Sequence, residues 1–410
     1  MELSLGTLPR GRRDTRPGRL SPWVALALVV AIGVNVRAIF GVTPPLIPVI
    51  SEDLGMNATT ASLLTSLSVL AMAAGAPLGH ALASRVGADR AMISLFAVLG
   101  LAELSRLVIG TAVPLVVTAG LIGVFLGAIS TLAPAFISHH LPRLRGLGTG
   151  VYSTSMALGV ALAAGTAQPI TDRAGWRFTL SLWGVGALLL VAALVVLSLR
   201  GLGIPRTTGP RERLALPLRE GRAWFVTVVY SVPMFLGFGV IAWLPTLFVD
   251  HGIDPTTAAV YLVCFQLVQF LSILTLAPLT DRIRGRRGVF ATAMVASTVG
   301  TLMLTWEPHD WALPGALLAG FGIGGASTLA LVKVQDEATS PQDATRLSSM
   351  CMLFSFTAGG AAPFLMGALK DATGSLVPGF GVCAAVSVLS LPLLIRMRPA
   401  GQPRWGDTPK

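Results

Sequence analysis

Twelve long apolar segments, separated by short polar connections, dominate this chain of 410 residues. Only 12% of its residues are charged and 53% are hydrophobic, whereas soluble proteins carry about 25% charged residues. The shortage of charge excludes a soluble enzyme. Because one membrane crossing needs about 20 apolar residues, the sequence predicts an all-α polytopic membrane protein with twelve transmembrane helices. We expect them at 22–49, 59–80, 91–109, 114–137, 147–169, 178–199, 223–249, 258–279, 289–305, 312–332, 347–369 and 379–395.

An internal duplication relates the first six segments to the last six. Four features recur in the same order about 200 residues apart: 54–61 and 251–258, 76–78 and 277–279, Arg145 and Arg346, and Asp172 and Asp371. This pattern predicts two pseudo-symmetric six-helix bundles in parallel orientation, an arrangement common in transporters that work by alternating access. The expected parts are a basic segment 1–21, an N-terminal bundle 22–199, a linker 200–222, a C-terminal bundle 223–396 and a tail 397–410.

Basic residues fix the expected orientation. Of the 30 lysines and arginines, 25 fall on the side of the N-terminus, and only Arg173, Arg177 and Lys370 fall on the other. Because cytoplasmic loops are enriched in basic residues, both ends and the linker are expected in the cytoplasm. The net charge of +11 is spread over seven segments without interleaved aromatic residues, so we expect no nucleic-acid partner.

Arg37 lies near the middle of the first apolar segment. A charged residue at this depth is costly and normally faces a cavity or a partner. Its neighbours at helical spacing, Gly33, Gly41 and Pro44, are small or rigid and are expected to leave room beside the guanidinium. Such a group can bind a planar anion through two hydrogen bonds, so Arg37 is predicted to contact the substrate. The alternative is a structural arginine that neutralises a buried acid.

Glu103 is the one carboxylate well inside a predicted span, and Arg106 follows three residues later. This spacing places both side chains on one helix face, where they could form an ion pair. The alternative is a role for Glu103 and Arg106 in proton coupling. Burial favours the neutral form of Glu103, whereas the neighbouring cation favours the charged form, so the sequence leaves both hypotheses open.

Three further side chains are candidates for the wall of a substrate cavity: Tyr152, Trp243 and Gln266. Each has a polar group within a predicted span and must find a partner, either as a contact between helices or as a contact to the substrate. Phosphate-binding loops, metal clusters and nucleophile motifs are missing from the sequence. We therefore expect no cofactor and no enzymatic activity.

The connection between the second and third segments carries a recognisable motif. Residues 79–90 read Gly-His-Ala-Leu-Ala-Ser-Arg-Val-Gly-Ala-Asp-Arg, and 278–287 form the second-half counterpart. The first copy resembles the loop signature of the major facilitator superfamily, with Ser84 where the pattern usually has an aspartate. The resemblance implies a latch between helix ends, made by Gly79, Arg85, Asp89, Arg90, Asp281 and Arg282.

The whole chain further resembles the cyanate and 2-nitroimidazole permease branch of that superfamily. Matching stretches are Arg37 with Pro44-Pro45-Leu46, Gly148–Tyr152, Gly175-Trp176-Arg177, Ala242–Pro245 and Gly367–Gly374. Departures are Ala38, Met352 and Phe356, where this branch often has proline, glutamine and tyrosine. The resemblance implies secondary active transport, by alternating access, of a small organic or inorganic anion or a heterocycle.

We therefore expect a monomeric permease of a bacterial inner membrane, embedded in the lipid bilayer. It has no ATP-binding module, so we expect its energy to come from a gradient, with a proton as the expected co-transported ion. One alternative is a proton-coupled drug exporter, but Val160 replaces the proline of the usual Gly-Pro signature after Gly159. The second alternative is a non-transporting sensor or scaffold, although such proteins typically carry a signalling domain.

Overall fold

The computed structural model describes residues 20–200, 216–282, 286–338 and 340–393, and within these ranges the side chains of 277–282, 286, 287, 335, 336, 341, 342 and 345 are not described. The described residues form helices and no strand. The helices are α1 (Pro22–Leu54), α2 (Ala58–Val86), α3 (Ala88–Leu104), the 3-10 turn η1 (Ser105–Val108), α4 (Ala112–His140), α5 (Arg145–Leu199), α6 (Gly221–Asp250), α7 (Pro255–Arg282), α8 (Arg286–Trp306), α9 (Ala312–Glu337), α10 (Pro341–Thr373) and α11 (Val377–Ser390).

Helix α5 contains two membrane crossings. Its 55 residues would extend about 80 Å as one straight helix, far more than the ~30 Å hydrocarbon core. The helix is interrupted at Gly175, whose φ of 81° and ψ of 160° are not helical, and a positive φ is adopted readily only by glycine. With the two arms of α5 and the shorter α11, the ten long apolar helices give the twelve expected crossings.

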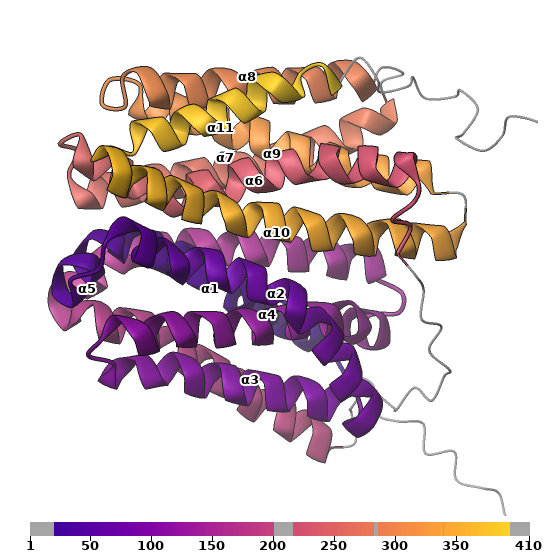
Figure 1. Cartoon of the computed structure of the whole chain (residues 1–410). Helices are drawn as coiled ribbons and strands as arrows, with labels where there is room; N and C mark the ends of the chain where they lie inside the picture. The colour runs from indigo at the N-terminus through magenta and orange to yellow at the C-terminus, as the bar shows by residue number, and fades with distance from the viewer. Residues whose placement is uncertain (1–19, 201–215, 283–285, 339, 394–410) are drawn as a thin grey trace, which may run out of the picture.

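The twelve crossings form two groups of six, as predicted. In Figure 1 the indigo and magenta helices α1–α5 lie together, and α6–α11 lie beside them in pink, orange and yellow. Within the first group α1 packs along α5 and α2 along α4, while α6 packs along α10 and α8 along α9 in the second. The two groups meet where α2 contacts α10, α5 contacts α7 and α1 contacts α6.

The duplication is visible in how glycines bring helices together. A Cβ on Gly123 or Gly127 of α4 would lie 2.2 or 2.1 Å from a carbonyl oxygen of α2. A Cβ on Gly320 or Gly324 of α9 would likewise lie 2.6 or 2.4 Å from a carbonyl oxygen of α7. Each of these two glycines lies 197 residues after its counterpart on α4. Small residues at such contacts let membrane helices pack closely, so both halves share one helix-pairing scheme.

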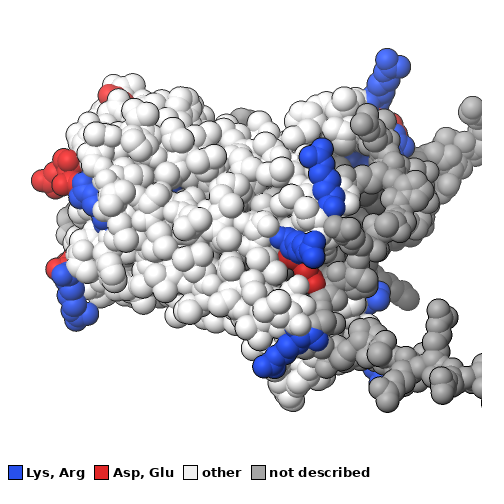
Figure 2. Space-filling view, turned by 90° about the horizontal axis from the view of Figure 1, so that it is seen from below, with Lys and Arg blue, Asp and Glu red and all other residues white. Residues whose placement is uncertain are grey.

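The outer surface has a nearly uncharged band between two charged ends, as Figure 2 shows for one face. Large apolar side chains point outward there, including Leu162, Leu189 and Leu271 at 45%, 67% and 54% exposure. A soluble protein rarely exposes so much contiguous apolar surface, whereas a protein surrounded by lipid must. We call the end holding Pro22, Leu199 and Gly221 the linker end, and the end holding Leu54, Ala58 and Thr373 the far end.

Candidate functional site

The Arg37 side chain lies half-buried near the middle of α1, between Val36 and Ala38, which are fully buried. Its guanidinium carbon is 5.5 Å from the ring centroid of Phe40 and 6.0 Å from that of Phe238. Among the residues that the structure describes, no carboxylate forms an ion pair with Arg37 and no group accepts a hydrogen bond from it. The guanidinium therefore has aromatic neighbours but no anionic partner within the described part of the chain.

The glycines beside Arg37 do not leave open space, contrary to the expectation from the sequence. A Cβ on Gly33 would lie 2.9 Å from the Tyr152 carbonyl oxygen, and one on Gly41 would lie 2.1 Å from the Val160 carbonyl oxygen. The backbone of α5 occupies the volume that a side chain would need. These glycines dock α1 on α5 above and below Arg37 and so fix the height of the guanidinium.

Phe238 brings the second half of the molecule to Arg37. This residue of α6 packs edge to face against Phe40 of α1, with 5.7 Å between ring centroids. It also packs against Phe356 of α10, with 6.3 Å between ring centroids. Phe40 and Phe238 are 198 residues apart, so repeat-related helices supply the pair. The guanidinium thus lies at the interface of the two halves and not within one bundle.

Two tyrosines complete the surroundings of Arg37. The phenols of Tyr152 on α5 and Tyr230 on α6 lie within electrostatic range of the guanidinium. Tyr152 is 9% exposed and its hydroxyl oxygen makes no hydrogen bond, although the hydroxyl of Ser130 lies nearby and donates to the Leu126 carbonyl at 2.7 Å. Tyr152 was expected here from the sequence, but Tyr230 was not.

The other two expected cavity residues, Gln266 and Trp243, differ from each other in their contacts. Gln266 of α7 is 5% exposed, and its side-chain oxygen is buried without a hydrogen-bond partner. It lies about one helical turn from Val263, whose side chain packs against Gly165 of α5. Trp243 is 1% exposed and its indole donates to the Pro363 carbonyl at 2.9 Å. That bond links α6 to α10 inside the second half.

Glu103 and Arg106 are buried within the first half, at 1% and 2% exposure. The salt bridge considered from their spacing is not formed. Because α3 ends at Leu104 and η1 follows, the guanidinium turns to α4, where its Nε donates to the Thr118 hydroxyl at 3.3 Å. The two groups remain within electrostatic range, and one carboxylate oxygen of Glu103 has no hydrogen-bond partner.

The structure describes the first copy of the latch motif. Gly79 packs closely on α4, where an added Cβ would lie 2.4 Å from the Ala128 carbonyl oxygen. Arg85 and Arg90 are exposed at the linker end, and Asp89 lies in the first turn of α3, where a negative charge favours the helix dipole. Asp281 and Arg282 have side chains outside the described residues.

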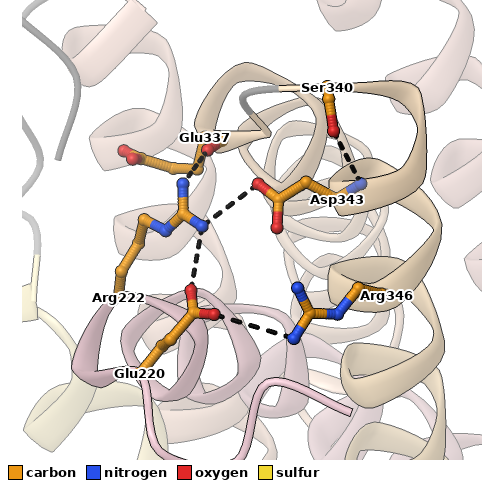
Figure 3. Close-up of polar contacts among 6 residues, drawn as sticks. All are labelled: Glu220, Arg222, Glu337, Ser340, Asp343 and Arg346. Carbon is orange, nitrogen blue, oxygen red and sulfur yellow. Dashed lines mark hydrogen bonds and ion pairs between the residues drawn. The ribbon is translucent and has the colours of Figure 1, made fainter. Parts of the chain in front are cut away.

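A charged network that the sequence did not reveal joins three helix ends of the second half (Figure 3). Arg222 donates to the Glu337 carbonyl at 2.7 Å, to Glu220 at 3.0 Å and to Asp343 at 3.1 Å. Arg346 lies 3.9 Å from Glu220. The network connects the starts of α6 and α10 to the end of α9. The sequence did not single out these residues because they lie near the ends of the predicted membrane spans, where charged residues are common.

A second unforeseen contact joins the two halves at the far end. Asp371, in the last turn of α10, accepts hydrogen bonds from the backbone N–H groups of Ala58 and Thr59 at 2.8 Å each and from the Thr59 hydroxyl at 2.5 Å. Asn57 accepts the next N–H, that of Thr60, at 2.9 Å. A carboxylate from one half therefore caps the first turn of α2 in the other half, where unpaired N–H groups favour negative charge.

The repeat-related position does not make the same contact. Asp172 is the counterpart of Asp371, but it accepts a hydrogen bond from Gln168 of its own helix at 2.9 Å. The start of α7 is capped instead by Asp254, which accepts from Thr256 and Thr257 at 3.0 and 3.1 Å. Of the two symmetry-related caps, only the one from α10 to α2 crosses between the halves in this conformation.

These features agree with comparisons to known proteins. The profile of the Major Facilitator Superfamily matches residues 26–262 and again 223–408. A solved structure, a D-xylose-proton symporter, has the same fold with a TM-score of 0.74 at 15% identity, covering 92% of this chain and 98% of that one. The chain therefore belongs to the Major Facilitator Superfamily, and the predicted fold and class, a secondary transporter, are confirmed.

Two relatives lie in the branch that the sequence resembles. The cyanate transport protein CynX of Escherichia coli is 27% identical over 92% of this chain and 98% of its own length. The 2-nitroimidazole transporter of Escherichia coli is 28% identical over 91% of this chain and 94% of its own length. The resemblance to this branch is thereby confirmed, and small molecules are the class of substrate that such transporters carry.

Proposed function

We propose that this protein carries a small monoanion across a bacterial inner membrane and that Arg37 binds the anion. The observation that carries the proposal is the guanidinium at the interface of the halves, which has no anionic partner among the residues described. A substrate carboxylate or similar group supplies the missing negative charge and accepts two hydrogen bonds from the guanidinium edge. Cyanate and 2-nitroimidazole, named for the two relatives, are the first compounds to test.

The proposed mechanism is alternating access about Arg37. The halves 22–199 and 223–396 rock against each other, so that the site opens to one end of the molecule at a time. We place the linker end in the cytoplasm because the basic residues gather on that side. Tyr152 and Gln266 remain in the proposed site as buried groups with unpaired oxygens, whereas Trp243 acts as a strut within the second half. The protein works as a monomer in the bilayer.

A gradient supplies the energy in this proposal, with a proton as the coupling ion.

The contacts of Glu103 and Arg106 lie within the first half. Glu103 packs against α5, where its Cβ lies 3.0 Å from the position that a Cβ on Gly184 would take, and Arg106 donates a hydrogen bond to Thr118 of α4. Because these contacts are internal to one bundle, we assign the two residues a structural role.

The experiment that tests the function is counterflow into proteoliposomes containing the purified protein. The panel holds cyanate, nitrate, acetate and 2-nitroimidazole, with xylose and choline as a neutral and a cationic control. Saturable uptake of at least one anion, without uptake of xylose or choline, is the expected outcome. Uptake confined to the neutral or cationic compounds would refute an anion transporter.

The contact of Asp371 with α2 is expected to hold the far end closed. Replacing an N-cap side chain by alanine costs about 1 kcal/mol, so Asp371→Ala should shift the ratio of closed to open states about fivefold toward open. Spin labels on Thr111→Cys and Asp310→Cys, in a background without the native cysteines, report the distance between the halves at this end.

Asp172→Ala is the matched control for this measurement, because Asp172 occupies the repeat-related position and bonds only within its own helix. Its distance distribution should match that of the unmodified protein. Equal distributions for Asp371→Ala and Asp172→Ala would show that the capping contact does not control closure.

A further inference from the structure

We propose that Phe238 makes the Arg37 site selective for flat aromatic monocarboxylates. This inference rests on the proposed function and names the substrate class of the same site. It begins with the geometry of the guanidinium, which has Phe40 and Phe238 at 5.5 and 6.0 Å from its central carbon. A cation–π contact engages the ring faces, whereas the N–H donors of arginine lie in its plane. The donors stay available for the two oxygens of a carboxylate.

The two rings beside Arg37 belong to a cluster of three phenylalanines. The Phe238 ring contacts both Phe40 and Phe356, with ring centroids 5.7 and 6.3 Å away. All three side chains come from different helices, α1, α6 and α10. A flat ring attached to the bound carboxylate meets these rings in offset or edge-to-face geometry, which aromatic pairs prefer. A saturated ring of similar size cannot form such contacts, because its puckered surface carries no π-electrons.

The charge of the substrate follows from the number of cations. Arg37 is the cation at this place, and its other electrostatic partners among the described residues are the neutral phenols of Tyr152 and Tyr230. A second negative charge on the substrate would have no counter-ion in a medium of low dielectric constant, and this is unfavourable. A single carboxylate therefore suits the site better than two. The unpaired hydroxyl of Tyr152 can bond to one polar ring substituent.

The same geometry connects binding to the movement of the halves. The carboxylate is held by Arg37 of the first half, and the aromatic ring is held by Phe238 and Phe356 of the second half. A ligand that uses both contacts bridges the interface. A small anion without a ring reaches only the guanidinium, so it gains less from closure of the halves.

The test compares benzoate with cyclohexanecarboxylate, which has the same charged group on a puckered ring. Binding to the purified full-length protein is measured by isothermal titration calorimetry, with terephthalate as the dianion. The unmodified protein should bind benzoate about fivefold to tenfold more tightly than cyclohexanecarboxylate, and terephthalate should bind more weakly than benzoate. Equal affinities for benzoate and cyclohexanecarboxylate, or tighter binding of terephthalate, would overturn the proposed selectivity.

Three variants complete the test. In Phe238→Leu the ratio of the affinities for benzoate and cyclohexanecarboxylate should fall to about one, and Phe238→Tyr should retain the preference for benzoate. Phe364→Leu is the control, because this residue of the same half is 44% exposed on α10 and should leave the preference unchanged. A full benzoate preference in Phe238→Leu would overturn the role of Phe238. The variant Arg37→Gln separates the two proposals: unchanged binding of both acids there would instead refute the anion site itself.

Discussion

Arg37→Gln is expected to reduce the flux of the transported anion at least about 30-fold, because removing one member of a desolvated, hydrogen-bonded charge pair costs about 2–5 kcal/mol. The flux of Arg37→Lys should lie between that of Arg37→Gln and that of the unmodified protein, since lysine keeps the charge but cannot form the same two-point contact. Initial rates of counterflow in proteoliposomes, normalised to reconstituted protein, measure both effects.

Thermal stability distinguishes this role from a structural one. An arginine within the membrane and without an anionic partner is costly, so Arg37→Gln should leave the melting temperature of the substrate-free protein unchanged or raise it. If Arg37 instead held the fold together, the variant would melt at a lower temperature. Loss of flux together with loss of stability would therefore contradict a role in substrate binding.

Glu103→Gln is expected to destabilise the protein without changing the pH dependence of transport. The substitution leaves Arg106, at 2% exposure, without a nearby negative charge, and breaking a buried charge pair costs about 3–5 kcal/mol. We expect the lower end, about 3 kcal/mol, because the two groups form no direct salt bridge. The double variant Glu103→Gln/Arg106→Met should recover part of the loss, since it removes both charges.

Thermal melting of the single and double variants measures this coupling. The pH profile of counterflow provides the readout that a structural role does not move. A Glu103→Gln protein of normal stability whose flux no longer depends on pH would identify Glu103 as a proton carrier, which is the alternative left open by the sequence.

Much of the fold could be predicted because a membrane permits few solutions. Apolar segments of about 20 residues must form helices, and the recurrence of four features at one spacing identified the duplication. The break in α5 was expected between 169 and 178, and Gly175 is the residue that makes it. Helix pairing could not be read in advance, because Gly127 and Gly324 show their close contacts only once the partner helices are known.

The site could be predicted only where charge made it conspicuous. Arg37 stands out in an apolar segment, whereas Phe238 and Tyr230 look like ordinary members of α6. The repeat offers a signal that could have found Phe238, since it lies 198 residues after Phe40. Phe356 had been noted as a departure from related permeases, and the structure gives it a contact with Phe238.

Contacts between the halves were beyond the reach of the sequence. Asp371 and Asp172 were recognised as repeat partners, yet only Asp371 crosses to the other half. A symmetric pattern cannot predict this difference, because the two halves of an alternating-access transporter are related differently at the two ends in any one conformation. Asymmetry of this kind belongs to the conformational state and not to the sequence.

The most direct test is a structure of the protein with its transported anion bound. Two oxygens of the anion should lie about 2.7–2.9 Å from the Arg37 guanidinium nitrogens, with the rest of the molecule against Phe238. Density for the anion elsewhere, with the Arg37 guanidinium still lacking an anionic partner, would contradict the assignment of Arg37 as the binding residue.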